Sequence, residues 1–295
     1  MLRGLRATRS GEIERDGAKV RYQVFGSAER SILLLPTWSI VHSDHWRHQV
    51  PYLAQRYTVL TFDGLGNGAS DRPTDPAYYT DDAFAADAAS VMDAAGIERA
   101  VVISSSLGAA WQLLLAHRYP HLVAASVYIA PYLPFPPLTR GYAEAELWWD
   151  EHLTLHAGWA MWNREFWHQD WPAFCRFFFS RCFTEPDSEE QIEHFLSMGL
   201  ETSPEVIAAT IDTEVISEET ARAAAEAVCV PTLVLHGDED AISSVESGRE
   251  FARLSGAELV VLPGSGHEPH CRIPSQVNGL LDAFLSKQYP SGTEA

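Results

Sequence analysis

The sequence predicts an α/β fold in which a mostly parallel, doubly wound sheet is covered by helices and interrupted by one helical insertion. Short apolar runs rich in Val, Ile and Leu alternate with stretches of helical length along most of the 295 residues. This alternation is typical of a parallel sheet with both faces covered. Residues 132–228 break the alternation because they contain no clear strand.

The strands and helices of the sheet region are expected in a regular order. Runs of β-branched, aromatic and aliphatic residues predict strands at 20–25, 31–35, 57–62, 100–103, 123–130, 232–236 and 258–262. Periodic or alanine-rich stretches predict helices at 45–55, 82–95, 108–119, 244–254 and 274–289. Asp81 or Asp82 is expected to cap the helix at 82–95, because a short acidic side chain accepts hydrogen bonds from the first free N–H groups.

Residues 132–228 differ in composition from the rest of the chain. Six of the nine tryptophans lie there, and they are Trp148, Trp149, Trp159, Trp162, Trp167 and Trp171. We expect this segment to be a helical cap, and residues 1–131 and 229–295 to form the sheet domain. Many of these aromatic residues will form the core of the cap, but so dense a cluster also indicates an apolar pocket wall.

Charge and cysteine content narrow the class of protein. The net charge of −19 argues against binding nucleic acid or an anionic membrane surface, and we interpret it as a source of solubility. No apolar run is long enough to span a bilayer, and residues 1–9 lack the apolar core of a signal peptide, so we expect a cytoplasmic protein. The four cysteines show no metal-ligand spacing, and no metal site is predicted.

A serine-rich turn follows the predicted strand at 100–103. Residues 104–108 read Ser-Ser-Ser-Leu-Gly and lead directly into a predicted helix, which is the context of a nucleophile elbow. The positions two before and two after the nucleophile must be small, since two backbones approach closely there. Only Ser106 satisfies this, with Ser104 and Gly108 beside it. The alternative is an ordinary serine-rich loop.

A serine nucleophile needs a base and an acid, and both follow at the ends of later strands. After the strand at 232–236, Asp238 and Asp240 are candidate acids, and the spacing favours Asp240. After the strand at 258–262, His267 follows a glycine on a loop, and His270 is the weaker alternative base. The order serine, acid, histidine suits this strand topology.

With these residues the chain resembles the α/β-hydrolase family over nearly its whole length. Gly237 to Asp240 matches the family's Gly-x-x-Asp, and Gly266-His267 matches its Gly-His. Residues 63–70 resemble its structural Asp-x-x-Gly-x-Gly-x-Ser loop, and the insertion resembles its cap. The resemblance implies an α/β-hydrolase fold and a catalytic triad of Ser106, Asp240 and His267.

The loop after the strand at 31–35 departs from the family pattern. Members usually have His-Gly there, followed by a residue whose backbone N–H helps to bind the oxyanion, whereas this chain has Pro36-Thr37-Trp38. The alignment implies that Trp38 donates that N–H together with Leu107. The predicted substrate-binding residues are Thr37, whose hydroxyl could also donate, Trp38 and Ser105.

These observations predict a serine hydrolase acting on an apolar or aromatic ester, thioester, lactone or β-diketone-type carbon–carbon bond through an acyl-enzyme. Serine at position 106 argues against the epoxide hydrolases and haloalkane dehalogenases that the chain resembles, which use aspartate there. The reaction needs no cofactor, and the expected partner is a small molecule bound by a monomer or homodimer. The alternatives are a ligand sensor, and a cyclase or lyase that uses the pocket without an acyl-enzyme.

Overall fold

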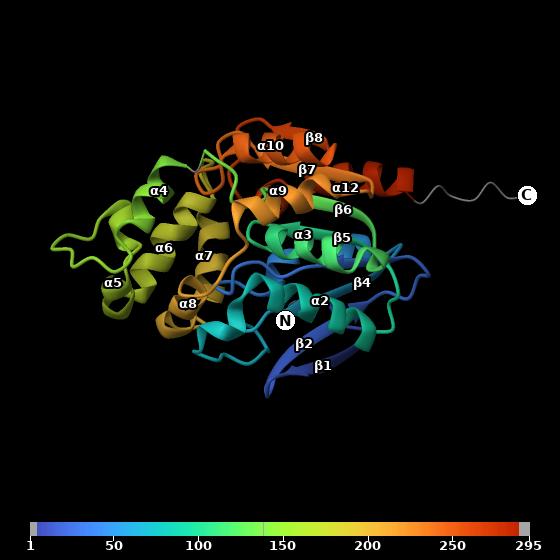
Figure 1. The fold of residues 1–295 in the computed structure, drawn as a ribbon, viewed down its shortest axis with the longest axis horizontal. Helices are drawn as coiled ribbons and strands as arrows, with labels where there is room; N and C mark the ends of the chain where they lie inside the picture. The colour runs from blue at the N-terminus through green and yellow to red at the C-terminus, as the bar shows by residue number, and fades with distance from the viewer. Residues whose placement is uncertain (1–4, 138, 289–295) are drawn as a thin grey trace, which may run out of the picture.

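A computed structural model describes residues 5–137 and 139–288, and it contains one eight-stranded sheet (Figure 1). The sheet order is β1-β2-β4-β3-β5-β6-β7-β8. The strands are β1 Arg9–Arg15, β2 Ala18–Phe25, β3 Ser31–Leu34, β4 Thr58–Asp63, β5 Ala100–Ser105, β6 Val123–Ile129, β7 Thr232–Gly237 and β8 Glu258–Leu262. From β4 to β8 all neighbours are parallel, so the carboxyl ends of β5, β7 and β8 lie at one edge. This confirms the predicted mostly parallel sheet.

Strand β1 was absent from the sequence prediction. It pairs antiparallel with β2 at the sheet edge, and β2 in turn pairs antiparallel with β4. Ile13 is its single large apolar residue, and none of the seven residues is buried. An exposed edge strand needs little apolar character, so the pattern of burial that identifies strands in a sequence is missing here.

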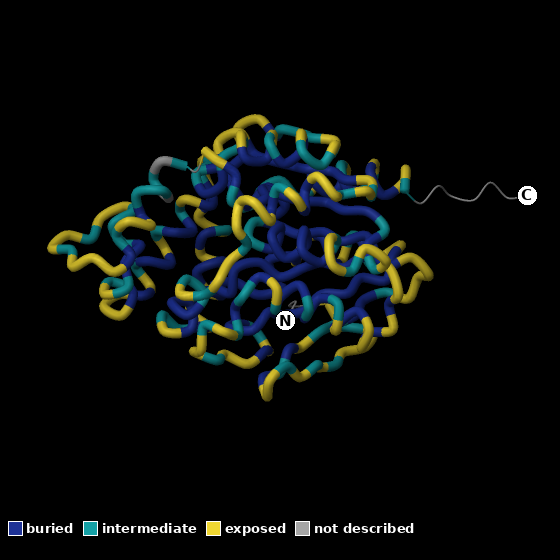
Figure 2. Tube along the Cα trace, viewed as in Figure 1, coloured by how far each residue is buried: buried dark blue, intermediate teal, exposed yellow. Residues whose placement is uncertain are grey.

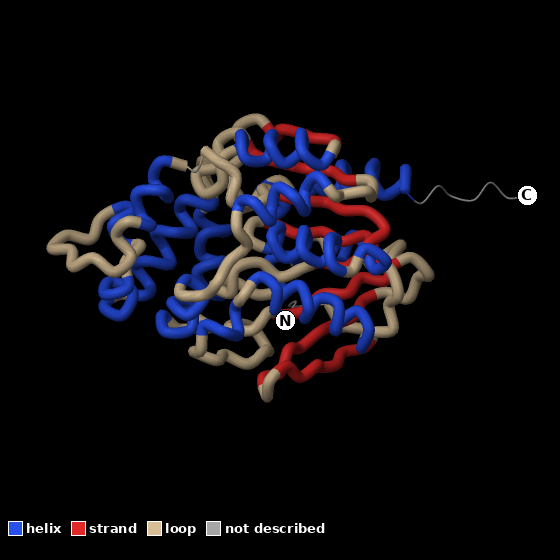
Figure 3. The backbone as a smooth tube through the Cα atoms, in the orientation of Figure 1, coloured by secondary structure: helices blue, strands red, loops and turns tan. Residues whose placement is uncertain are grey.

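Helices cover both faces of the sheet (Figure 3). One apolar core joins the sheet to α2, α3, α9 and α10, and a second joins its other face to α1 and α12. The helices of the sheet domain are α1 Val50–Leu53, α2 Asp81–Ala94, α3 Gly108–Arg118, α9 Glu218–Glu226, α10 Val245–Ser255, α11 Pro269–Arg272 and α12 Pro274–Gln288. None of the helices in the described part of the chain is long and apolar enough to cross a membrane.

Two details of the predicted helices were wrong. The stretch 45–55 forms a short 3₁₀ turn at Ser43–Trp46 and the four-residue α1, because Pro51 fits only in the first turn of a helix. Helix α2 is capped by Thr80, whose Oγ1 accepts a hydrogen bond from the Ala83 N–H. The Asp81 carboxylate instead accepts hydrogen bonds from more distant parts of the chain.

A helical layer lies beside the sheet, at the left of Figure 1, and is inserted between β6 and β7. It contains α4 Arg140–Glu146, α5 Arg164–Gln169, α6 Trp171–Cys182, α7 Glu189–Gly199 and α8 Pro204–Ile211. Buried aromatic rings form its own core, which also takes in Trp38 from the sheet domain. Figure 2 shows buried segments within this layer as well as in the sheet. Helix α9 lies within the predicted cap range but packs on α3 and α10, beside the sheet.

Candidate active site

Ser106 lies at the sharp turn between β5 and α3. Its φ of +51° is in the left-handed region, which a residue with a side chain adopts only when its surroundings hold it there. A Cβ on Gly108 would lie 2.5 Å from the Pro36 carbonyl oxygen and 3.4 Å from the Ser104 Cβ. The close approach of these backbones therefore explains why small residues flank the serine.

The structure brings the predicted nucleophile, base and acid together. His267 Nε2 lies 2.8 Å from Ser106 Oγ, and His267 Nδ1 lies 2.7 Å from Asp240 Oδ2. These distances suit a histidine that accepts the serine proton while its other nitrogen donates to the carboxylate. The alternatives lie elsewhere: Asp238 accepts a hydrogen bond from the Gly264 N–H, and His270 contacts His45.

The Asp240 carboxylate is buried and surrounded by donors. Its Oδ1 accepts hydrogen bonds from the backbone N–H groups of Ile242 and Ser243, at 2.8 and 2.9 Å. Burial alone would raise the pKa of Asp240, but His267 and His236 outweigh burial and lower it. Asp240 is therefore ionised at neutral pH and able to stabilise a positive charge on His267.

The pKa of His267 shifts in the opposite direction to that of Asp240. Its burial disfavours the charged form, but the neighbouring Asp240 outweighs burial and raises the pKa of His267 above 6.5. An imidazole whose pKa is raised accepts a proton more readily, which suits the predicted role of His267 as a base.

His236 is a site residue that sequence reasoning did not find. It lies at the end of β7, is fully buried, and places Nε2 3.2 Å from Asp240 Oδ2 and 3.0 Å from the Ser243 carbonyl oxygen. The available signal was a histidine at a strand end, four residues before the acid. That signal is weak because histidine is also common in ordinary cores.

The end of helix α6 supports the histidine loop from the cap. The His267 N–H donates to the Cys182 carbonyl oxygen at 2.9 Å, and the Gly266 N–H donates to Glu185 Oε1 at 2.8 Å. Thr184 Oγ1 also donates to the Glu239 carbonyl oxygen beside the acid, at 3.2 Å. The cap thus contacts both loops, the one that carries His267 and the one that carries Asp240.

The residues predicted to bind the oxyanion and the substrate do not all lie at the cavity. The backbone N–H groups of Trp38 and Leu107 have no acceptor among the described residues, and Leu107 precedes α3, where a helix favours negative charge. Their role in binding an oxyanion stays a prediction. Trp38 lines the cavity at Ser106, but Thr37 and Ser105 are buried and do not line it.

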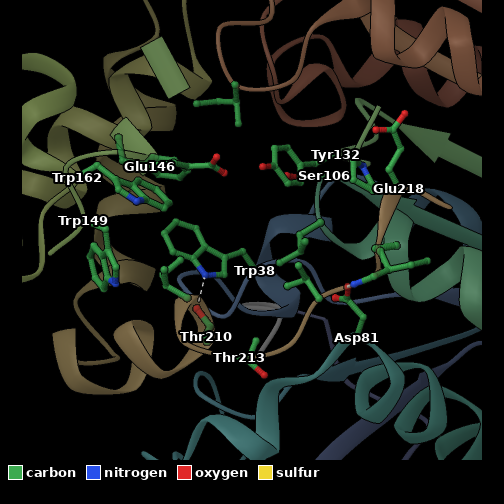
Figure 4. Close-up of a pocket in the computed structure, with 18 of the residues that line it drawn as sticks. Trp38, Asp81, Ser106, Tyr132, Glu146, Trp149, Trp162, Thr210, Thr213 and Glu218 are labelled. Atoms are coloured by element: carbon green, nitrogen blue, oxygen red, sulfur yellow. Dashed lines mark hydrogen bonds between the residues drawn. The ribbon is translucent and has the colours of Figure 1, made fainter. Parts of the chain in front are cut away.

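A cavity of about 630 Å³ opens at Ser106, between the sheet edge and the cap (Figure 4). This volume is in the range of sites for small organic molecules. Its aromatic wall comes mainly from the cap, with Trp149, Trp162 and Phe178 beside Trp38. Trp38 stacks on Trp162 with ring centroids 5.3 Å apart, and its Nε1 donates to Thr210 Oγ1 at 2.7 Å.

A buried polar cluster lies next to His267 in the chain but outside the cavity wall. Burial raises the pKa of Glu268 to about 7 and lowers the pKa of His270 to about 3. Of the described side chains, those of His45, Glu268 and His270 form one group that could hold a metal, with ligand atoms within 4.8 Å of one another. His45 Nδ1 and His270 Nε2 lie 3.3 Å apart in direct contact.

This fold, with a serine at a strained strand-to-helix turn and a histidine and carboxylate at later strand ends, defines the class of α/β hydrolases. Residues 31–271 match the sequence profile of the alpha/beta hydrolase fold family, so the chain belongs to that family. The prediction of an enzyme of this family is thereby confirmed.

Known proteins of this family align over almost the whole chain. The sequence is 24% identical to "3-oxoadipate enol-lactonase 2" of Acinetobacter baylyi over 269 residues, 91% of this chain and 93% of that protein. The structure of a hydrolase from Pseudomonas aeruginosa PA01 superposes with a TM-score of 0.75 at 25% identity, covering 95% and 99% of the two chains. An esterase from Rhodococcus sp. ECU1013 superposes with a TM-score of 0.78 at 21% identity, covering 95% and 98%.

Proposed function

We propose that this chain is a serine hydrolase that cleaves an apolar or aromatic carboxylic ester, thioester or lactone through an acyl-enzyme. The observation that carries the proposal is the position of His267, hydrogen-bonded to Ser106 Oγ on one side and Asp240 Oδ2 on the other. The aromatic lining of the cavity supports an apolar or aromatic substrate. The name of the related enol-lactonase supports the same class of bond.

In this mechanism Ser106 Oγ attacks the substrate carbonyl while its proton moves to His267 Nε2. The N–H groups of Trp38 and Leu107 bind the oxygen that becomes negative. His267 then gives the proton to the departing alcohol, thiol or ring oxygen, and the acyl group stays on Ser106. A water molecule, deprotonated by His267, attacks the acyl-enzyme and releases the acid.

An alkyl fluorophosphonate tests this proposal without knowledge of the substrate. We expect one adduct per chain on Ser106, none in Ser106→Ala, and strongly slowed labelling in His267→Ala, because the serine is a weak nucleophile without its base. Intact and peptide mass spectrometry measure the adduct. The exposed His168→Ala is the matched control, and it should label like the wild type.

Ester turnover completes the test. A panel of neutral aryl and alkyl esters, thioesters and lactones should be hydrolysed by the wild type and not by Ser106→Ala. Full turnover by Ser106→Ala would contradict the mechanism. A folded wild-type protein that takes no adduct and turns over no ester would contradict the function, and ligand-induced stabilisation would then identify the sensor alternative.

A further inference from the structure

The cavity at Ser106 has three acidic side chains in its wall and no basic side chain among its described lining residues. Asp81, Glu146 and Glu218 line it, whereas none of its described lining residues is Lys, Arg or His. A negatively charged group on a substrate would be repelled by this wall, and a positive group would be attracted. The charges that line the cavity therefore favour a positively charged substrate over a negatively charged one.

Two of the three carboxylates are already engaged by the protein. Asp81 Oδ1 accepts a hydrogen bond from Trp111 Nε1 and Oδ2 accepts one from the Ile216 N–H, both at 2.7 Å. Glu218 Oε1 accepts a hydrogen bond from Arg222 Nε at 2.8 Å, one turn along α9. Both side chains therefore have structural partners that explain their presence.

Glu146 is different, because it makes no hydrogen bond or ion pair with any described residue. It is the last residue of α4, and Figure 4 shows its carboxylate pointing into the cavity. Glu146 is exposed as a residue, yet the protein around its carboxyl group raises its pKa, and no neighbouring charge or donor offsets that effect. A carboxylate in the cavity wall without a partner among the described residues would attract a cation into the cavity.

Aromatic rings next to Glu146 add a second attraction for positive charge. Trp38 and Trp162 lie on the same side of the cavity (Figure 4), and a cation is attracted to the face of an indole ring. The cap already shows such a contact, since the Arg164 guanidinium lies 4.6 Å from the ring centroid of Trp149. A carboxylate beside indole rings that line the cavity suits an alkylated ammonium group better than a compact, strongly hydrated ion.

We propose, as a refinement that rests on the proposed hydrolase function, that the substrate carries an amine or quaternary ammonium group. Its positive charge binds Glu146 and the indoles of Trp38 and Trp162, while its ester carbonyl lies at Ser106. The protein thus selects cationic over neutral substrates and rejects anionic ones.

Binding can be measured without catalysis. Full-length Ser106→Ala is titrated in a calorimeter with benzyltrimethylammonium, and the neutral benzyl alcohol is the comparison ligand. We expect the cation to bind more tightly, and Glu146→Gln in the same background to weaken cation binding about tenfold without affecting the alcohol. The charge-matched control is Glu151→Gln, an exposed cap residue that does not line the cavity.

Selectivity in turnover is measured with three benzyl acetates. Their para positions carry a trimethylammoniomethyl, neopentyl or carboxymethyl group, so that the first two differ in charge and little in shape. The wild type should prefer the cation over the neutral ester in kcat/KM by about tenfold and hydrolyse the anion worst. Glu146→Gln should abolish this preference while the neutral ester keeps its kcat/KM.

The outcomes separate the two proposals. Hydrolysis of the neutral ester with an unchanged cation preference in Glu146→Gln would overturn the ammonium site and leave the hydrolase function intact. Equal binding of the cation and the alcohol would also overturn it. Failure of every ester and of fluorophosphonate labelling would overturn the hydrolase function, and cation binding to Ser106→Ala would then still decide the ammonium site.

Discussion

At the residue scale, the environment of Asp240 depends on a side chain outside the proposed triad, that of His236. Its Oδ2 faces two imidazoles, His267 at 2.7 Å and His236 at 3.2 Å. His236 Nδ1 has no hydrogen-bond partner among the described residues, so a proton on Nε2 fits these contacts. From there it can donate to Asp240 or to the Ser243 carbonyl oxygen, and we expect His236 to position Asp240.

His236→Phe tests this positioning role through the pH profile. Without the second donor, Asp240 interacts more strongly with His267, so the pKa of His267 rises and the acid limb of kcat/KM moves to higher pH. Looser placement of Asp240 should also lower kcat about tenfold, the size expected for a lost hydrogen bond to a charged group.

His236→Gln is the matched control for this change, because its amide can donate from nearly the same place. It should restore both kcat and the acid limb toward wild type. A lower kcat with an unshifted acid limb in His236→Phe would assign His236 to packing alone.

At the scale of elements, the strand-to-helix turn of Ser106 depends on close packing of three backbone segments. The Ser106 N–H donates to the Ile129 carbonyl oxygen at 3.0 Å, and the Tyr132 N–H donates to the Ser106 carbonyl oxygen at 3.0 Å. The loop after β3 closes over the start of α3, where Pro36 approaches Gly108. These contacts hold a positive φ at Ser106 that an isolated peptide would not keep.

Gly108→Ala should damage this turn. The new Cβ would lie 2.5 Å from the Pro36 carbonyl oxygen, so the loop that carries Trp38 must move. We expect unfolding to become easier by about 2 kcal/mol, and kcat to fall more than KM rises. Urea denaturation and ester kinetics measure the two effects.

Gly279→Ala is the control for the loss of a glycine. Gly279 lies on α12, and a Cβ there would meet nothing within 4 Å. Replacing a helical glycine by alanine should stabilise the protein by about 0.5–1 kcal/mol. Unchanged stability and activity in Gly108→Ala would show that the turn tolerates a side chain and would contradict our account of it.

At the scale of the whole molecule, we expect a group of buried and half-buried histidines to make stability depend on pH. Burial lowers the pKa values of His42, His45, His194 and His270 below their ordinary 6.5. Just below pH 6.5 these rings therefore bind protons in the unfolded chain but stay largely neutral in the folded protein. Their contribution to stability is therefore full above pH 6.5 and is lost as the pH falls below it.

We expect the free energy of unfolding, measured by urea denaturation, to fall steeply between pH 7 and 5.5, by up to about 1.4 kcal/mol per pH unit for each histidine. Glu268 opposes this trend, because its pKa is raised to about 7 and its contribution is lost as the pH rises through that value. His270→Gln should reduce the number of protons taken up on unfolding, read from the slope of the free energy of unfolding against pH, by about one. The exposed His168→Gln should leave that slope unchanged. A midpoint that does not change with pH would contradict this account.

Local patterns along the chain were enough to predict the sheet region and the three residues proposed for the triad. Strand and helix periodicity is local, and the small residues around Ser106 and the glycine-bearing loops of Asp240 and His267 can be recognised within a few positions. The edge strand β1 carries no such pattern because it is exposed, and residues 45–55 form no continuous helix because Pro51 fits only in a first helical turn. The capping of α2 by Thr80 is a local detail that the acidic pair beside it obscured.

Only the folded structure shows which residues, far away in the sequence, contact these side chains. His236 reaches Asp240 because a loop folds back after β7, and Cys182 reaches the His267 loop from the cap, far away in the sequence. Asp81 and Glu218 have partners, whereas Glu146 has none among the described residues, and no sequence pattern distinguishes them. Hydrogen bonds, burial and charge balance depend on distances in space, and these are set by how separate elements pack.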